Sequence, residues 1–205
     1  MKQLTAAIIT LGMLAMLGAC VAQELPPKEN AHPFAITLTE FKAQALPHTT
    51  RAFLVDVDGE GMQGMLVIGE LYNMTRTEYH VYFLYEGQLR SGRAGTYPSV
   101  DANNRLIAHS RGNNNASYSF YSVFDHQLFV TRSLSGGFDD REGHDLHFFI
   151  EWNGEGYDQH NITPQEFERM RTEFGLDHIR EPGWWETHPN QYAEILAMTL
   201  PEESP

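Results

Sequence analysis

The sequence predicts an α+β protein: a mostly antiparallel β meander, sandwich or open barrel with one N-terminal helix and one or two C-terminal helices. Two observations lead to this prediction. Runs rich in aromatic and β-branched residues recur about every ten residues between Gly, Asn and Asp clusters, which is typical of antiparallel strands. Helical patterns stand before and after these runs, so the helices are expected to flank the strands.

The N-terminal helix is predicted within PFAITLTEFKAQAL, which starts at Pro33. Proline suits the first helical position, and Pro47 prevents the helix from continuing. Apolar residues recur at spacings of four, three and four, which places them on one helix face. A strand over FAITL is the competing interpretation. The apolar face consists of Phe34, Leu38, Phe41 and Ala45.

The middle of the chain carries the predicted strands. Residues 101–104 and 112–115 are Asn-rich separators, where turns are expected. The run from Tyr79 to Tyr85 is apolar on both alternating faces, which predicts a central strand covered on both sides by a helix or a second sheet. The strand-like runs are RAFLVDV, GMLVIGELY, EYHVYFLYEG, NRLIAHS, SYSFYSVFD, QLFVTRSLS and DLHFFIEWN.

The C-terminal third begins with a hairpin turn, NGEG at residues 153–156, followed by the short strand YDQHN. A helix follows in ITPQEFERMRTEFG. Thr163 and Glu166 form a capping box at its start, and Gly175 stands at the position of a left-handed terminator. A second helix is predicted around residues 190–198. The apolar face of the first of these helices consists of Phe167, Met170 and Phe174.

The charge of the chain limits the classes of partner that it is expected to bind. The 205 residues include 14 Lys and Arg against 27 Asp and Glu, which gives a formal net charge of −13. This balance disfavours the phosphate attraction behind most nucleic-acid binding, so no nucleic-acid partner is expected. It also disfavours peripheral attraction to anionic lipid. The length predicts one domain and a targeting segment.

The N-terminus has the pattern of a signal peptide. Lys2 precedes an apolar run from Leu4 to Leu17, which is too short for a comfortable bilayer crossing. The next residues, LGAC, end at Cys20, the only cysteine, and resemble the lipobox of bacterial lipoproteins. That resemblance implies cleavage before Cys20 and acylation of its sulfur. An ordinary secretory signal cut after Ala22 is the alternative.

These features predict three segments. Residues 1–19 form a lipoprotein signal peptide, and residues 20–32 form a proline-containing tether that starts at the lipidated Cys20. Residues 33–200 form a single globular domain. The expected location is the extracytoplasmic face of the bacterial cell membrane, where the lipid anchor holds the protein.

The segment DVDGEG contains a candidate metal site. Asp56, Asp58, Glu60 and the backbone carbonyl of Met62 occupy positions that supply oxygen ligands in a calcium loop. Position 12 of that pattern is the apolar Val67, so only half of the ligand set is present. A weak Ca²⁺ site is one interpretation, and an acidic turn that needs no metal is the other. The distant carboxylates considered for completing the site are Asp139, Asp140 and Glu142.

A second candidate is the pair Trp184 and Trp185, which could form a platform for a ligand or fill one end of the core. No catalytic residue can be nominated. The ten histidines are dispersed, and neither a metalloprotease, a phosphate-loop nor a nucleophile-elbow motif is present in the sequence.

The order of these motifs resembles a group of uncharacterised lipoproteins from Gram-positive bacteria. In that group a VDxDG-G strand–turn–strand precedes a meander and a closing ITxxEF helix. The similarity runs from Phe34 to Gly175. It implies the same fold and a place on the cell surface, and it implies no particular activity.

Two functional hypotheses follow. The first is a non-catalytic binding or structural module that contacts a cell-envelope component or another protein through an exposed aromatic or acidic patch. The second is an envelope hydrolase acting on glycans, which requires a cleft with two carboxylates about 5–10 Å apart. The absence of a catalytic motif from the sequence favours the first hypothesis.

Overall fold

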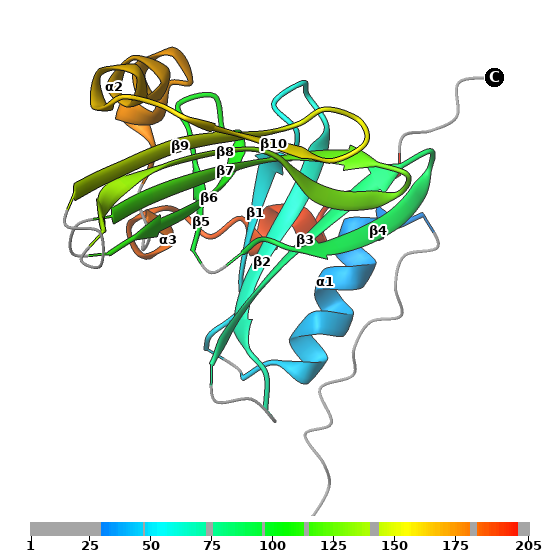
Figure 1. Ribbon diagram of the computed structural model, residues 1–205. Helices are drawn as coiled ribbons and strands as arrows, with labels where there is room; N and C mark the ends of the chain where they lie inside the picture. The colour runs from blue at the N-terminus through cyan, green and yellow to red at the C-terminus, as the bar shows by residue number, and fades with distance from the viewer. Residues whose placement is uncertain are drawn as a thin grey trace, which may run out of the picture.

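The computed structural model confirms the α+β prediction, with two open antiparallel sheets, one N-terminal helix and several short C-terminal helices (Figure 1). The predicted signal peptide, Cys20 and most of the predicted tether lie outside the residues that it describes. Within those residues, no helix is long and apolar enough to span a membrane. The structure describes residues 30–46, 48–72, 76–95, 97–112, 115–139, 144–180 and 184–200.

The first sheet is a four-stranded meander in the order β1-β2-β3-β4. Each strand pairs in antiparallel register with the next one along the chain. This arrangement places β3, the predicted central strand, between β2 and β4. The strands are β1 (Arg51–Asp56), β2 (Gln63–Glu70), β3 (Thr77–Tyr85) and β4 (Gln88–Arg93).

The second sheet has six strands in the order β10-β9-β8-β7-β6-β5, so its strands also follow the chain. β8 carries a bulge opposite Phe120 and Tyr121, where the register with β7 shifts. Such a bulge bends and twists the strand locally. The strands are β5 (Pro98–Val100), β6 (Leu106–Arg111), β7 (Asn115–Phe124), β8 (Gln127–Asp139), β9 (His144–Trp152) and β10 (Tyr157–Asn161).

Helix α1 (Pro33–Gln44) covers one face of the four-stranded sheet, and α4 (Tyr192–Leu196) packs beside it (Figure 1). Pro33 is the first helical residue, and the side chain of His32 accepts a hydrogen bond from the Phe34 N–H at 3.1 Å. The helix prediction is therefore confirmed. The buried residues of this layer are Phe34, Leu38, Phe41, Ala45, Ala52, Met65, Val67 and Ile195.

The other face of the four-stranded sheet packs against the six-stranded sheet. On β3, Val81 and Phe83 point into this shared core, whereas Tyr82 and Leu84 pack in the layer under α1. The prediction of a central strand covered on both sides is therefore confirmed. The buried residues of the shared core are Phe53, Val55, Val57, Leu66, Ile68, Val81, Phe83, Ala94, Val100, Leu106, Tyr121 and Trp184.

Helix α2 (Pro164–Glu173) covers one face of the six-stranded sheet, and its signals act as predicted. The Thr163 hydroxyl accepts the Glu166 N–H at 3.2 Å, and the Glu166 carboxylate accepts the Thr163 N–H at 2.8 Å. Gly175 ends the helix in the left-handed region at φ 70°. The buried residues of this third core are Ile107, Tyr118, Phe120, Leu134, Phe167 and Leu176.

Several short elements were not predicted. β4 has the sequence QLRSGR, which lacks aromatic and β-branched residues, and it forms because the turn at Glu86 and Gly87 returns the chain beside β3. β5 has only three residues, fewer than a periodic pattern needs. The 3-10 helix η1 (Leu176–His178) and helix α3 (Trp184–Thr187) are single turns.

Candidate functional site

Asp56, the first acidic residue of the DVDGEG segment, ends β1 and closes the loop that follows. Its Oδ1 accepts the Gly59 N–H at 2.8 Å, and its Oδ2 accepts the Gly61 N–H at 3.2 Å. Both glycines have positive φ, 79° and 100°, which a residue with a side chain rarely adopts. Both carboxylate oxygens of Asp56 are therefore used to hold a turn.

Asp58 stabilises the same loop. Its Oδ1 accepts the N–H groups of Glu60 at 2.9 Å and Met62 at 3.1 Å, while the Glu60 side chain is exposed. Calcium requires about six to eight oxygen ligands. In the described part of the chain, no three His, Cys, Asp or Glu residues are grouped so that they could hold a metal ion. The calcium hypothesis stays a prediction, and the observed bonds are those of an acidic turn.

The side chain of Arg105 lies against this loop. The backbone of Arg105 bridges to Asp56, and a Cβ placed on Gly59 would lie 2.6 Å from the Arg105 Cδ. Burial lowers the pKa of Arg105, and the nearby Asp101, Asp56 and Asp58 act in the opposite direction. The acidic loop therefore helps to compensate the desolvation of an arginine where the two sheets meet.

Trp184 lies in the core between the sheets. Its side chain is 7% exposed, and its ring lies 4.6 Å from the ring of Phe53. The ring also lines a hollow of about 300 Å³ with Phe53, Arg180 and His188, so the platform interpretation stays a prediction. The side chain of Trp185 and the predicted lipidation site Cys20 lie outside what the structure describes.

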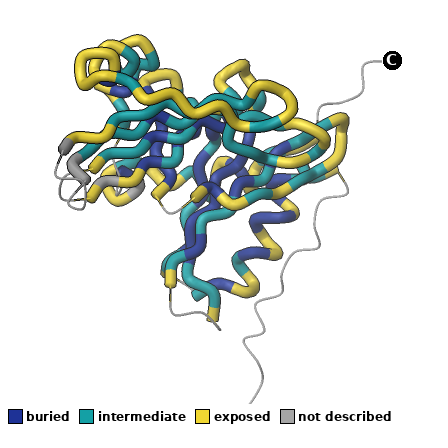
Figure 2. Tube along the Cα trace, viewed as in Figure 1, coloured by how far each residue is buried: buried dark blue, intermediate teal, exposed yellow. Residues whose placement is uncertain are grey.

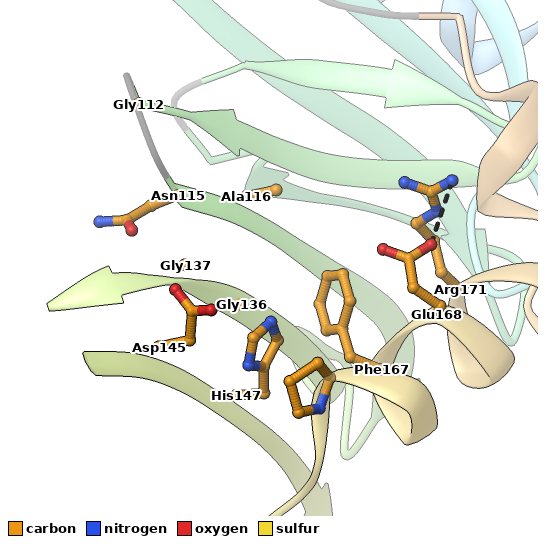
Figure 3. Close-up of a pocket in the computed structure, with 11 residues that line it drawn as sticks. Gly112, Asn115, Ala116, Gly136, Gly137, Asp145, His147, Phe167, Glu168 and Arg171 are labelled. Carbon is orange, nitrogen blue, oxygen red and sulfur yellow. Dashed lines mark ion pairs between the residues drawn. The ribbon is translucent and has the colours of Figure 1, made fainter.

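A polar hollow of about 400 Å³ lies between α2 and the ends of β7, β8 and β9 (Figure 3). His147 and Phe167 close over Gly136, where an added Cβ would lie 2.5 Å from the His147 Cδ2. Asp145 stands beside His147 on β9, and Glu168 pairs with Arg171 on α2 at 3.3 Å. The hollow thus brings two carboxylates and a histidine to one place. Sequence reasoning had nominated none of these residues.

The opposite face of β9 carries apolar side chains that pack in none of the three cores. Because side chains alternate along a strand, Leu146, Phe148, Ile150 and Trp152 share one face, and His147 on the other face is covered by α2. In the described part of the chain, none of these four apolar residues belongs to a buried cluster.

The strand register shows what surrounds this apolar stripe. Ile150 pairs with Ser133 on β8 and with Gln159 on β10, and Trp152 pairs with Tyr157. The same rows continue to serines on β7. We call this surface the open face, and it consists of Ser117, Ser119, Ser133, Ser135, Leu146, Phe148, Ile150, Trp152, Tyr157, Gln159 and Asn161.

The open face is accessible along the outer strands of the sheet. Tyr157 is 53% exposed and Leu146 is 39% exposed, while Phe148, Ile150 and Trp152 are half-buried. Every residue of β10 is exposed (Figure 2). The apolar side chains of this face therefore remain in contact with solvent, whereas Val81 and Phe83 of β3 are fully buried.

Aromatic rings lead from Trp152 toward the tip of the β7–β8 hairpin, where Phe124 and Phe129 stand on the other face of β7 and β8 from the serines of the open face. The Trp152 ring lies 5.1 Å from that of Tyr157 and 5.9 Å from that of Phe129, which in turn lies 6.1 Å from Phe124. Phe124 is 66% exposed. The Tyr157 hydroxyl donates to the Val130 carbonyl at 2.8 Å, which fixes this ring over β8.

The polar part of the open face is uncharged. Ser117 and Ser135 join their hydroxyls at 2.8 Å across β7 and β8, and Ser119 and Ser133 do so at 3.1 Å. The remaining polar groups are a phenol and two carboxamides. No residue of the open face is ionisable at neutral pH, although the chain as a whole carries a formal charge of −13.

Part of this surface could have been found in the sequence. DLHFFIEWN was predicted as a strand, and its apolar residues at every second position indicate one apolar face. Phe149 makes the other face partly apolar as well, so the sequence does not tell which face is covered. That choice depends on α2, whose residues pack against Phe149 and leave Phe148 outside.

Comparisons with known proteins give no match to this chain among protein-family models, curated proteins or solved structures. The similarity to surface lipoproteins drawn from its motifs therefore stays a prediction.

Proposed function

We propose that the chain is a lipid-anchored, non-catalytic binding module of the bacterial cell envelope, and that its open face is the binding surface. The observation that supports this proposal is a contiguous apolar and aromatic surface without a partner in any of the three cores. Exposed surfaces of this kind are typical of interaction sites, because apolar area left in water contributes nothing to folding.

The position of the open face fits this role. β7, β8 and β9 are held rigidly from behind by α2, so the binding side chains stand on a sheet rather than on loops. A rigid surface loses little conformational freedom when a ligand binds. The lipobox at Cys20 and the tether after it would present this domain outside the membrane.

A glycan hydrolase is the second candidate, and the hollow under α2 is the observation that favours it. Asp145 and Glu168 line the same space, as an acid–base pair would require, and His147 lies between the sheet and α2. Glu168 is paired with Arg171 at 3.3 Å, which suits an ionised carboxylate. Reducing ends released from isolated cell walls, and lost in Asp145→Asn, would favour this candidate over the binding module.

The binding proposal is tested by sedimentation with isolated bacterial cell envelopes. The full chain carries Cys20→Ser, so that no lipid contributes to the result. We expect the protein to sediment with the envelopes, and we expect Phe148→Ser combined with Ile150→Ser to weaken this binding about tenfold or more. Both changes place on β9 the residue type already present beside it on β8.

The control variant is Tyr72→Ser, which removes a side chain that is 62% exposed and lies outside the open face. It should sediment like the parent protein. Equal sedimentation of all three proteins, or failure of all three to sediment, would contradict the proposal. Thermal unfolding of each variant shows whether it is folded before binding is compared.

The anchor is tested separately by cell fractionation. The unmodified chain should remain in the membrane fraction, because each buried methylene of an acyl chain contributes about 0.8 kcal/mol. Cys20→Ser should be released into the periplasm or the medium. Retention of Cys20→Ser in the membrane fraction would contradict lipidation while leaving the open-face proposal intact.

A further inference from the structure

We infer that the open face binds an uncharged polysaccharide that lies along β9, between β8 and β10. This inference rests on the proposed binding function and names the class of its ligand. Three features carry it: the mixture of rings and hydroxyl-bearing groups, the lack of charge, and the length of the apolar stripe along β9.

The chemistry of the surface matches that of a sugar chain. Sugar rings combine faces of C–H groups, which pack on apolar and aromatic side chains, with hydroxyls that both donate and accept hydrogen bonds. Trp152, Tyr157 and Ile150 supply the apolar contacts, and Gln159 and Asn161 stand beside them on an exposed strand. Carboxamides and hydroxyls can donate and accept in the same way as sugar hydroxyls.

The charge distribution opposes the other occupants. An anionic chain would be repelled by a protein of formal charge −13, and a second copy of this chain carries the same charge. A basic protein would find no carboxylate on the open face itself. Protein interfaces also tend to contain arginine and few serines, whereas the open-face residues of β7 and β8 are all serines. A neutral ligand forms no ion pairs, so its binding does not require charged residues on the open face.

The geometry fits an extended chain rather than one sugar. Leu146, Phe148, Ile150 and Trp152 stand at every second position of β9, and Tyr157 lies beside Trp152 on β10. Because a strand rises about 3.3 Å per residue, this apolar stripe spans roughly 20 Å along β9. An extended sugar chain can therefore lie along β9, with the serines of β8 on one side and Gln159 and Asn161 of β10 on the other.

The test uses the same envelopes after two treatments. Mild periodate oxidises vicinal diols of sugars, and protease removes proteins. We expect periodate to abolish sedimentation of the Cys20→Ser chain and protease to leave it unchanged. We also expect the binding to stay constant between low and high salt, because no ion pair is involved. The soluble competitors are dextran and laminarin, which are neutral, and alginate, which is anionic.

Each outcome decides one point. The inference is supported if a neutral polysaccharide competes with the envelopes for the protein. Trp152→Ala should then lose binding to the envelopes, and Tyr72→Ser should keep it. Binding that is destroyed by protease, that yields only to alginate, or that survives periodate without competition by laminarin, whose 1,3-linked sugars lack vicinal diols, overturns the inference. The binding function stands if the Phe148→Ser and Ile150→Ser changes still weaken the binding. If the open-face variants bind the envelopes as strongly as the parent protein, both the polysaccharide inference and the proposed binding function are overturned. Trp152→Phe keeps a ring at the same place and should retain most of the affinity.

Discussion

Strand β3 of the four-stranded sheet and strand β9 of the six-stranded sheet are built from the same kinds of residues but are covered differently. β3 alternates apolar side chains between two layers, and Val81 and Phe83 are fully buried. β9 is also apolar on both faces, yet α2 covers only the face that carries Phe149. Strand composition alone therefore does not distinguish a structural strand from one that displays a surface.

This difference separates stability from binding. Burial of apolar area stabilises a fold by about 25 cal/mol per Å² removed from water, and the β3 side chains contribute this fully. The exposed part of Phe148 and Ile150 contributes less to the fold and stays available to a ligand. The neighbouring edge strand β10 is short and polar, which limits unwanted pairing with other strands.

The largest difference in unfolding free energy is expected between two matched phenylalanine substitutions. Phe83→Ala removes a fully buried ring from the shared core and should cost about 3–5 kcal/mol of unfolding free energy. Phe148→Ala removes a half-buried ring from the open face and should cost about 1 kcal/mol. Urea unfolding measures both. Equal losses would show that the open face is part of the folding core.

The second prediction concerns the covered face of the same sheet. Gly136→Ala places a Cβ 2.5 Å from the His147 Cδ2 and 2.8 Å from the Phe167 Cε2, so α2 must shift away from the sheet. We expect a loss of about 1–3 kcal/mol in urea unfolding. Gly156→Ala is the matched control, because nothing lies within 4 Å of the Cβ that it adds. If Gly136→Ala is as stable as that control, α2 does not hold this face closed.

The third prediction tests the cap of α2. Thr163→Ala removes the hydroxyl that accepts the Glu166 N–H and should cost about 1 kcal/mol, whereas Thr163→Ser should cost much less. A thermal shift of roughly 2–4 °C is expected for a chain of this size. If Thr163→Ala and Thr163→Ser unfold at the same temperature, the cap does not contribute.

The same cap has a pH dependence. Hydrogen bonds from the backbone and side chain of Thr163 lower the pKa of Glu166 below its ordinary value of 4.5. The contribution of Glu166 is therefore complete above that value and is lost as the pH falls through the lowered pKa. The difference in stability between the parent and Thr163→Ala should narrow below about pH 4. A constant difference down to pH 2 would contradict the ionic part of the cap.

The smallest effect is expected from calcium. Asp56 and Asp58 already accept N–H groups of their own loop, so we expect the same unfolding temperature in chelator and in 10 mM calcium. A site with a Kd of about 0.1 mM would instead add about 2.7 kcal/mol at that concentration. A rise of roughly 5–10 °C that disappears in Asp56→Ala would show that the loop binds the ion.

The fold was predictable wherever the signal is local. Pro33, the Thr163–Glu166 box and Gly175 each act within one turn of the chain, and the structure places them as expected. β4 was not predictable, because QLRSGR becomes a strand only through pairing with β3. Local propensity gives no sign of such tertiary pairing.

The candidate site was less predictable, because it depends on contacts between distant residues. The sequence left the DVDGEG loop open between a metal site and a turn, and the loop's neighbour Arg105 is far away along the chain. Trp184 was recognised as a notable ring, but its burial follows from packing on Phe53. The open face was missed since the sequence does not say which side of β9 receives α2.

The central claim is that the open face is where the protein meets the cell envelope. Hydroxyl-radical footprinting of the Cys20→Ser chain, with and without isolated envelopes, tests it at individual side chains. We predict that Phe148, Ile150, Trp152 and Tyr157 become protected from labelling, while the exposed Tyr72 stays fully reactive. Unchanged labelling of the open face, or protection confined to residues outside it, would contradict the account.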